Sequence, residues 1–416
     1  MSVSTFATGT LWLSYYRQPS ILQPELHTYF QGLAKKHGPI FKLWLGAKLT
    51  IVVTYSEVVQ EILRTNDLIF ANHDVPAVAP ANTYGGIEIV WSLYGPKWRM
   101  LRKLCVNRIL SNAMLDSSTE LRRGETRKTV RYLADQAQVG SPVNLGEQIF
   151  LMILNVVTQM LRGTTVKGEE REIVGAEFLE LITEMNDLLL KPNISDFFSE
   201  MDRESDGRVV DFLDVLLKVK DEEDDKTKLN MNDVKALLMK AQQELDKVVG
   251  KNKVVEESHI SKLPYILAIM KETLRLHTII PLLVPCRPSQ TTVVGGFTIP
   301  KDSKIFINVW AIHRNPNIWE DPLKFDPDRF LDKSCDFNGN DFNYLPFGSG
   351  RRMCAGMAMG ERVVLYNLAT FLHSFDWIIP QEERVGVEET FGIVLKLKNP
   401  LVATPVLRLS DPNLYL

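Results

Sequence analysis

The chain has 416 residues, of which 45% are hydrophobic and 24% are charged, a composition typical of a globular protein with a large core. Its 48 basic and 51 acidic residues leave a net charge of −3, so no nucleic-acid partner is predicted. Four widely spaced cysteines form no CxxC pair, which argues against a zinc ribbon, a thioredoxin-like site or a disulfide scaffold and favours a reducing compartment.

The N-terminal part of the chain begins without the basic and apolar segments of a signal peptide. The longest apolar run, at 149–161, is too short to span a bilayer, so no transmembrane helix is predicted. Residues 40–55 predict two strands around a turn at Gly46, because both flanks are rich in β-branched and aromatic residues. The segment "SEVVQEILRTN" then predicts a short helix capped by Ser56.

The middle of the chain is predominantly helical in pattern. A helix with Pro96 near its start is predicted over 95–110, and helices dominate from about 117 to 190. Two charged runs, at 199–208 and 220–228, bracket a short predicted helix and are expected to be solvated surface.

The C-terminal part alternates between helices and short strands. Residues 258–277 predict an amphipathic helix with Ser258 as its N-cap. A hairpin around Gly295–Gly296, a strand at 304–310, a helix after Cys354 and a final hairpin near 392–409 follow. The chain is therefore predicted to be mainly α with small peripheral β-sheets, and the lack of βαβ alternation excludes a Rossmann or barrel fold.

The segment "PFGSGRRMCAGMA" places Cys354 alone among glycines and arginines. A buried inert thiol is the usual fate of a lone cysteine, whereas a nucleophile needs a base, and His373 lies far along the next helix. A thiolate metal ligand is a third interpretation, because glycines let backbone N–H groups approach the sulfur and arginines favour the thiolate. One cysteine cannot form a tetrahedral zinc site, but it can supply the axial ligand of a haem.

Two pairs of residues share helix faces elsewhere. Glu272 and Arg275 lie at i and i+3 in "KETLR", on a helix that is otherwise apolar, so the pair needs a further partner such as Arg329 to offset its desolvation. Trp98 and Arg102 lie at i and i+4 and could hold a carboxylate or phosphate of a ligand. A solvated surface pair and a basic helix face are the respective alternatives.

The segment "FGSGRRMCAG" resembles the haem-binding signature of the cytochromes P450. It is joined by "KETLR" upstream, by "FDPDRF" between them and by "WRMLRK" in the first quarter, all in the order found in that family. The positions that match the signature are Phe347, Gly350, Arg352, Cys354 and Gly356.

The resemblance covers about residues 28–198 and 209–416 and is strongest to the plant microsomal A-type enzymes. The chain is similar to the delta-cadinene 8-hydroxylase group, with geraniol 8-hydroxylase and flavonoid 3'-hydroxylase as neighbours. The resemblance implies a single P450 domain over 1–416. Residues 28–239 would form its N-terminal, substrate-side part and residues 240–416 its haem-binding core.

The resemblance also implies roles for the matching residues. Cys354 would be the proximal thiolate ligand of the iron of haem b, Phe347 would pack beside the sulfur, and Gly350 would allow the tight bulge of the loop. The remaining residues fall into two groups: the haem propionates would be bound by Trp98, Arg102 and Arg352, and a buried structural network would be formed by Glu272, Arg275 and Arg329.

The activity implied by the resemblance is monooxygenation of a small apolar secondary metabolite, with a terpenoid as the first expectation and a flavonoid as the second. The implied partners are O2 and an NADPH–cytochrome P450 reductase. The implied location is the cytosolic face of the endoplasmic reticulum membrane, although no anchor is recognised in this chain and a cytosolic location is left open.

The sequence departs from the family where oxygen is activated. The Ala/Gly-Gly-x-Asp/Glu-Thr motif of the distal helix is absent, so no catalytic residue is assigned. "NMNDVKALLM" resembles the start of that helix and "KAQQELDKVVGKNK" resembles the following one, which places a join near Met239–Lys240. The substrate-roof segment is also short near 199–208, and Cys286 stands where relatives often carry a basic residue.

These departures predict a P450 with internal deletions, arising from a splice form or an imperfect gene model. Losing a central helix costs far more than the marginal stability of a domain, so impaired catalysis or folding is expected. The alternative function is a non-catalytic or defective haem-binding variant that lacks oxygen activation. A cysteine-nucleophile hydrolase is a third class, which the four matching motifs disfavour.

Overall fold

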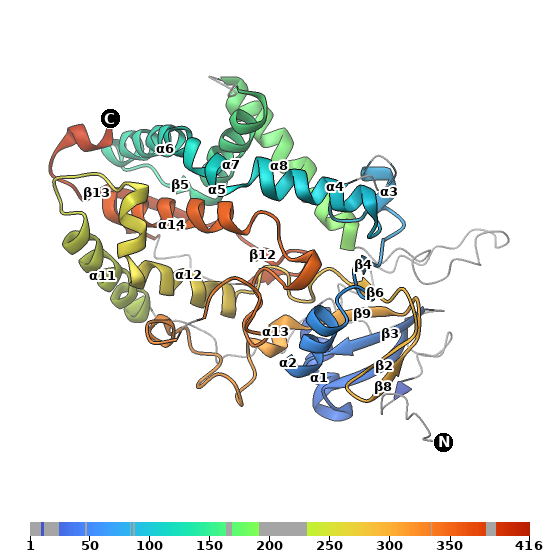
Figure 1. Cartoon of the computed structure of the whole chain (residues 1–416). Coiled ribbons are helices and arrows are strands. Elements are labelled where there is room, and N and C mark those ends of the chain that lie inside the picture. The colour runs from blue at the N-terminus through green and yellow to red at the C-terminus, as the bar shows by residue number, and fades with distance from the viewer. Residues whose placement is uncertain are drawn as a thin grey trace, which may run out of the picture.

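The structure is a computed structural model that describes residues 10–11, 25–45, 48–83, 85, 88–163, 169–190, 231–333, 335–379 and 388–416. The turn at Gly46, both charged runs and the short helix predicted between them lie outside the described residues. Within the described residues the chain is helix-rich with small sheets, as predicted (Figure 1).

The largest sheet of the described residues joins strands from the N-terminal part of the chain with strands from 286–307. The strands at 40–45 and 48–53 pair antiparallel, which confirms the predicted pair, and Val52 lies opposite Phe306 in a parallel pairing. Figure 1 shows these blue N-terminal strands beside the orange ones. The strand order is β1-β2-β3-β9-β6-β4, with bounds β1 Thr10–Leu11, β2 Ile40–Leu45, β3 Lys48–Val53, β9 Lys304–Ile307, β6 Cys286–Arg287 and β4 Asn72–His73.

The smaller sheets confirm one predicted hairpin and correct another. Gly295 and Gly296 have φ of +58° and +79°, which suits the tight turn of the predicted hairpin. The final hairpin near 392–409 is wrong, because its two halves pair with different strands, and an alternating pattern identifies a strand but not its partner. The pairs are β7 Thr292–Val294 with β8 Phe297–Ile299, β11 Glu389–Thr390 with β12 Lys396–Leu397, and β13 Val402–Leu407 with both β10 Phe375–Ile378 and β5 Val143–Asn144.

The helices follow the predicted ranges closely between 95 and 190. The α-helices are α1 Leu26–His37, α2 Ser56–Gln60, α3 Ala79–Asn82, α4 Pro96–Leu104, α5 Asn112–Ser117, α6 Thr119–Val139, α7 Leu145–Arg162, α8 Glu169–Leu190, α11 Met231–Val248, α12 Pro264–Leu276, α13 Val309–Ile312 and α14 Met357–Ser374. The π turns are η2 Glu61–Thr65 and η3 Cys105–Ile109, and the 3-10 turns are η5 Glu257–Lys262, η6 Pro327–Phe330, η7 Gly350–Arg352 and η8 Pro412–Tyr415.

Both predicted serine caps are wrong. Ser56 is the first residue of α2, with Tyr55 at the N-cap, and its hydroxyl donates to Glu57 rather than capping the helix. Ser258 lies in η5, and α12 begins only at Pro264. Because proline lacks an N–H and clashes with the carbonyl four residues before it, it is tolerated in the first turn and breaks a helix that would run through it.

The main core lies where α11, α12 and α14 meet. Leu245 of α11, Ile266 of α12 and Tyr366 of α14 are buried in one cluster with Trp319 and Tyr344 from the irregular segments. Figure 1 shows α14 between α6 and α12, and both of these helices contact it. The N-terminal loop of α14, which carries Cys354, is therefore fixed to a well-packed helix.

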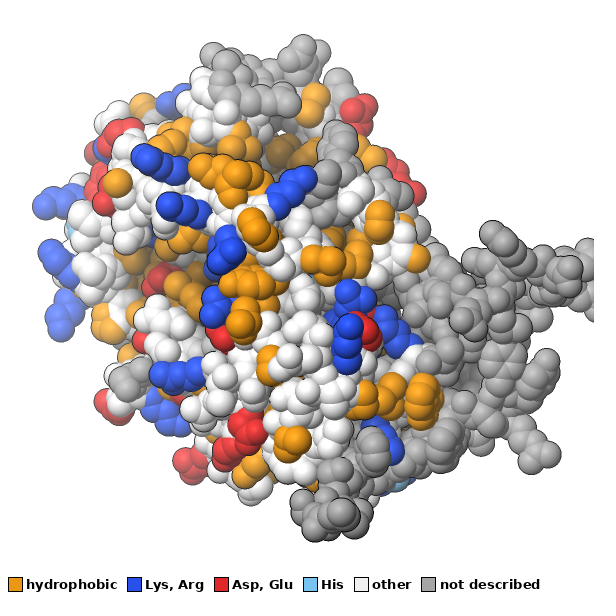
Figure 2. All heavy atoms as spheres, turned by 45° about the vertical axis from the view of Figure 1, so that its right-hand side comes forward, with side chains coloured by type: hydrophobic (Ala, Val, Ile, Leu, Met, Phe, Trp, Pro, Cys, Tyr) orange, Lys and Arg blue, Asp and Glu red, His pale blue; other side chains and the backbone are white. Residues whose placement is uncertain are grey.

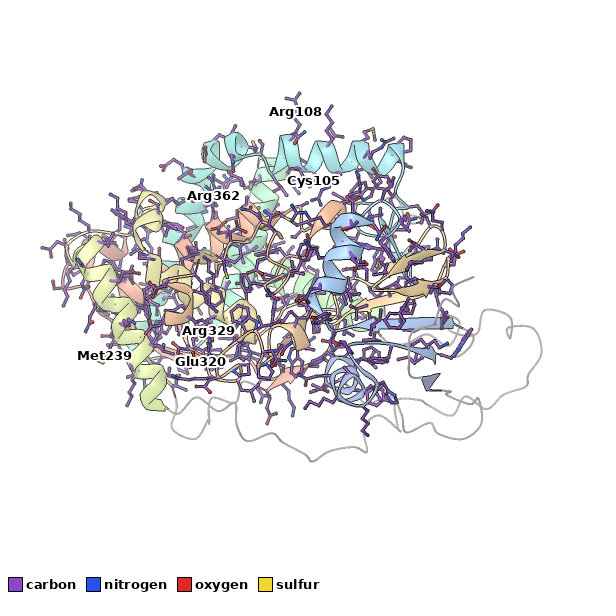
Figure 3. The ribbon with its side chains drawn as sticks, turned by 60° about the horizontal axis from the view of Figure 1, so that its bottom comes forward. Cys105, Arg108, Met239, Glu320, Arg329 and Arg362 are labelled. Atoms are coloured by element: carbon purple, nitrogen blue, oxygen red, sulfur yellow. The ribbon has the colours of Figure 1, made fainter. Side chains whose placement is uncertain are left out.

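Helix α11 runs without a break through the predicted join. Leu237 and Leu238 pack against the same core as Ala241 and Leu245, a spacing that keeps all four on one helix face. Met239 is 59% exposed and lies on the outer side of α11 (Figure 3). The segments that resemble two different helices thus share one apolar stripe in this chain.

Candidate active site

The loop before Cys354 depends on two glycines in left-handed conformations. Gly348 and Gly350 have φ of +71° and +68°, which L side chains rarely adopt. A Cβ on Gly350 would lie 2.3 Å from the carbonyl oxygen of Leu63 in η2, whereas one on Gly348 would meet nothing within 4 Å. The bulge therefore presses its backbone against η2, and only glycine fits at Gly350.

Cys354 presents its thiol at the start of a long helix. Its backbone N–H donates to the carbonyl of Phe347 at 3.0 Å, and α14 begins three residues later. All four cysteines are described, and Cys354 is the exposed one, although Tyr344, Leu345 and Ser349 in the same loop are buried.

Two further residues of the matching motif lie beside this thiol. Gly356 is the N-cap of α14, and a Cβ there would lie 3.9 Å from the Cys354 sulfur. Phe347 is half-buried, packs against the main core and meets the Phe337 ring edge-on at 5.4 Å between centroids. Phe347 thus links the loop to the core.

Arg352 and Trp98 hold the segment that precedes α4. The Arg352 guanidinium donates to backbone carbonyls, at 2.6 Å to Ala71 and 2.6 Å to Ser92, with further bonds to Ile89 and Val90. Its carbon lies 4.4 Å from the Trp98 ring centroid, and the indole N–H of Trp98 donates to Ile89 at 2.9 Å. Burial lowers the pKa of Arg352 to about 10. Two of the three predicted propionate ligands, Arg352 and Trp98, thus bond to this chain's own backbone.

Arg102 lies near the thiol and is half-buried on α4. No hydrogen bond to its side chain is found within the part of the chain that the structure describes. Burial lowers the pKa of its guanidinium, and the thiols of Cys105 and Cys354 act in the opposite direction. Arg102 is therefore the residue of this group best placed to receive an anionic ligand group.

The predicted network around Glu272 is brought together. Arg275 donates to the Glu272 carboxylate at 2.7 Å through Nε and at 2.8 Å through Nη2, and neither side chain is exposed. Arg329 Nε donates to Glu272 Oε1 at 3.1 Å, and the backbone N–H of Asp326 donates at 2.7 Å. Arg329 also donates to the Glu320 carbonyl at 2.9 Å, and Figure 3 shows these two residues together. These added bonds offset the desolvation of the buried pair.

Two residues of this region had no sequence signal. His313 and Thr278 are both buried and connect the Glu272–Arg275 pair to the Cys354 loop. Neither residue belongs to a motif with a recognisable spacing, so the sequence does not distinguish it from an ordinary core or loop residue. Their role depends on contacts between segments far apart in the sequence.

The chemistry of these residues fits a haem. Its porphyrin supplies four nitrogens and needs one axial ligand from the protein, and the exposed Cys354 thiol can be that ligand. The half-buried Arg102 beside it suits a propionate carboxylate. No group of three or more His, Cys, Asp or Glu that could hold a metal ion is found among the described residues.

Comparison with known proteins places this site in a family. The family model described as Cytochrome P450 matches residues 9–203 and 237–403, which is most of the chain. The chain belongs to the cytochrome P450 family. This P450 is therefore one of the haem-dependent monooxygenases, and the family match resumes inside α11, two residues before the predicted join.

Curated relatives of this P450 come from plants. It is 33% identical to a flavonoid 3'-monooxygenase of Crocosmia x crocosmiiflora, covering 92% of this chain and 89% of the relative. It is 32% identical to a geraniol 8-hydroxylase of Swertia mussotii (93% and 91% covered) and to an iridoid oxidase of Catharanthus roseus (91% and 88% covered). A zebrafish cytochrome P450 solved with abiraterone shares the fold, with a TM-score of 0.69 at 22% identity over 93% of this chain and 100% of that one.

The alignments also show that this P450 is shorter inside than its relatives. The first spans 451 positions, yet 92% of the 416 residues is about 383, so about 68 aligned positions have no residue in this chain. Among the described helices, none is long and apolar enough to cross a membrane.

Proposed function

We propose that this P450 is a haem-thiolate monooxygenase that hydroxylates a small apolar plant metabolite, with a terpenoid as the first candidate substrate and a flavonoid as the second. The observation that carries the proposal is the exposed Cys354 thiol, held at the N-terminus of α14 by a loop that requires Gly350. The substrate classes are supported by the relatives, which are named for flavonoid and geraniol hydroxylation.

The residues of the site divide the work of holding the cofactor. Cys354 would hold the iron through its sulfur, and Phe347 places an apolar ring beside the loop. Arg102 would receive a propionate, while Arg352 and Trp98 keep the segment at 89–92 in place. When bound, haem b supplies the reductive activation of O2 and the insertion of one oxygen atom into a C–H bond.

The rest of the chain supports that site. Glu272, Arg275 and Arg329 fix the irregular segments that lead to the Cys354 loop. In this proposal, residues 1–416 form one P450 domain. The part at 240–416 contains the haem-binding core, and the part at 28–239 contributes the substrate side.

The proposed electron donor is an NADPH–cytochrome P450 reductase, with O2 as the co-substrate. Helix α4 and η3 carry the exposed basic residues Arg99, Lys103 and Arg108 close to Arg102. Figure 3 shows Arg108 projecting away from the protein, and Figure 2 shows Lys and Arg side chains among hydrophobic ones on one face. Such a surface suits an acidic partner. The proposed location is the cytosolic face of the endoplasmic reticulum membrane.

The test is reconstitution of the full chain with haem, reductase and NADPH, followed by assay with geraniol and with a flavonoid. The proposal predicts NADPH-dependent hydroxylation of at least one substrate, and loss of that activity in Cys354→Ser. Hydroxylation that survives Cys354→Ser would overturn the assignment of the ligand.

A second candidate function is a haem-binding P450 variant without oxygen activation. It is favoured by the unbroken α11 and by the absence of the oxygen-activating threonine motif from the sequence. The reduced, CO-bound spectrum separates the candidates when combined with turnover. A thiolate-type spectrum without any product supports the second candidate, and a thiolate-type spectrum with product supports the first.

A further inference from the structure

His313 lies at the centre of contacts between the buried ion pair and the Cys354 loop. Its imidazole is 0% exposed and lies 5.5 Å from the Tyr344 ring between centroids. Nε2 is 3.0 Å from the backbone N–H of Leu345, and Nδ1 is 3.1 Å from the hydroxyl of Thr278. The carbonyl of His313 accepts from Arg275 Nη1 at 2.7 Å.

The hydrogen bonds around His313 fix its tautomer. Leu345 can only donate through its N–H, so Nε2 is the acceptor and carries no proton. The hydroxyl of Thr278 donates its proton to the Arg275 carbonyl at 3.0 Å, so towards His313 it can only accept, and the donor is Nδ1–H. The neutral Nδ1–H form therefore satisfies every polar atom of the ring.

The surroundings of His313 disfavour its charged form on balance. Burial removes water from the ring and lowers the pKa of the imidazole to about 3, and the positive charges of Arg275 and Arg314 act in the same direction. A proton on Nε2 would also point at the Leu345 N–H and break that bond. The ring is thus a neutral connector with a fixed orientation.

The bond to Leu345 acts on the loop that carries the thiol. The carbonyl of Leu345 accepts from Gly348 at 3.1 Å, which holds the turn, and the carbonyl of Phe347 accepts from Cys354 at 3.0 Å. Leu345, Gly348 and Ser349 are buried, so a backbone N–H that lost its partner here could not form a hydrogen bond to water instead. A shift at Leu345 is therefore transmitted through the turn towards Cys354.

We propose that His313 is a positioning residue for the Cys354 thiolate, a neutral bridge that ties the Glu272–Arg275 pair to the backbone of the ligand loop. The proposal rests on the proposed function of Cys354 as the iron ligand. Through the contacts of His313 with Arg275 and Leu345, the buried ion pair would hold the ligand loop in place.

Two substitutions separate the two nitrogens of the ring. In His313→Gln the amide oxygen reaches the position of Nε2 and can accept from Leu345, whereas in His313→Asn the shorter amide can replace only Nδ1. The matched control is the pair His373→Gln and His373→Asn. His373 is also 0% exposed, and its Nε2 bonds to the Lys253 carbonyl at 3.0 Å, on the far end of α14 from Cys354.

The first measurement is amide hydrogen exchange of the peptide that contains Leu345, in the full chain without added haem. We expect exchange about tenfold or more faster in His313→Asn than in His313→Gln, and no difference between the two His373 variants. Equal exchange in His313→Asn and His313→Gln overturns the proposal.

The second measurement is the reduced, CO-bound spectrum of the haem-loaded variants. We expect His313→Gln to keep most of the thiolate-type band and His313→Asn to lose most of it, with both His373 variants keeping it. A band retained in His313→Asn overturns the proposal. If the unmodified chain gives no thiolate band, the proposed role of Cys354 fails, while the exchange experiment still decides whether His313 holds the loop.

Discussion

The loop around Cys354 and the helices α7 and α8 are built in opposite ways. Around the loop, Glu272, Arg275 and His313 are fully buried, and each polar atom of these three side chains has a partner. On α7 and α8, Leu161 and Leu181 are 63% and 61% exposed. The buried polar side chains around the Cys354 loop are thus paired with one another, whereas α7 and α8 leave apolar side chains exposed to water.

The difference indicates where the fold is strictly specified. A buried ionic network tolerates almost no change, because removing one partner leaves an uncompensated charge without water. An exposed leucine loses little when it is replaced. We therefore expect substitutions to be costly on the ligand side and nearly neutral on the α7–α8 surface.

The largest expected effect is that of Glu272→Gln. The substitution removes the negative charge and leaves Arg275 charged and buried without a counter-ion. This loss should lower the free energy of unfolding by about 3–5 kcal/mol. Urea unfolding followed by circular dichroism measures the loss. The control is Glu388→Gln. In the unmodified chain the Glu388 and Lys398 side chains form a salt bridge in which both are exposed, and such a pair is worth less than about 1 kcal/mol. Similar losses in both variants would contradict the contrast between the regions.

The next prediction separates the cost of a positive φ from the cost of a steric clash in the loop before Cys354. Gly348→Ala adds a side chain at positive φ in open space and should cost about 1 kcal/mol. Gly350→Ala has the same strain, and its Cβ also meets the Leu63 backbone, so a cost of about 3 kcal/mol or more and a loss of haem binding are expected. Thermal unfolding and haem titration of the two variants decide this, and equal costs would show that the bulge does not press on η2.

A smaller effect is expected from acid. Burial lowers the pKa of His313 to about 3 and that of His73 to about 4, whereas in the unfolded chain each titrates near the ordinary value of 6.5. Between pH 6.5 and about 4 the unfolded chain binds more protons, so stability falls as the pH falls, by at most about 1.4 kcal/mol per pH unit for each histidine.

Melting temperatures between pH 7.5 and 5 measure this dependence. We expect a shallower decline in His313→Gln, because glutamine does not titrate, and an unchanged slope in that variant would show that His313 does not contribute.

The smallest effect is expected on the exposed surface. Leu161→Ser should change the free energy of unfolding by no more than about 0.5 kcal/mol. Leu245→Ala, in the main core, should cost about 2–5 kcal/mol. Denaturant midpoints of the two variants give the comparison, and a large loss in Leu161→Ser would mean that this leucine is covered in solution.

Part of the fold, and the residues of the candidate site, could be predicted from the sequence. The Cys354 motif, the KETLR segment and the helices from 95 to 190 carry local signals, namely spacing, helix periodicity and glycines at a bulge. The sequence also predicts a join at Met239–Lys240, within α11, although not that Leu237 and Ala241 would lie on one apolar stripe of that helix.

Other features depend on contacts that no local pattern encodes. The partner of β13 is set by packing against β10 and β5, and the role of His313 is set by Thr278 and Leu345, which lie 35 and 32 residues away. Pro264 is a local signal for the start of α12. The amphipathic pattern begins upstream of this proline, however, and so led to the prediction of one longer helix from residue 258.

The proposed role of Cys354 as the ligand of a haem iron is decided by the reduced, CO-bound spectrum of the haem-loaded chain. We expect a thiolate-type band in the unmodified chain and in the Cys105→Ser variant, in which the half-buried cysteine of η3 is replaced, and no such band in Cys354→Ser. A thiolate band that survives Cys354→Ser, or one that is lost only in Cys105→Ser, would contradict it.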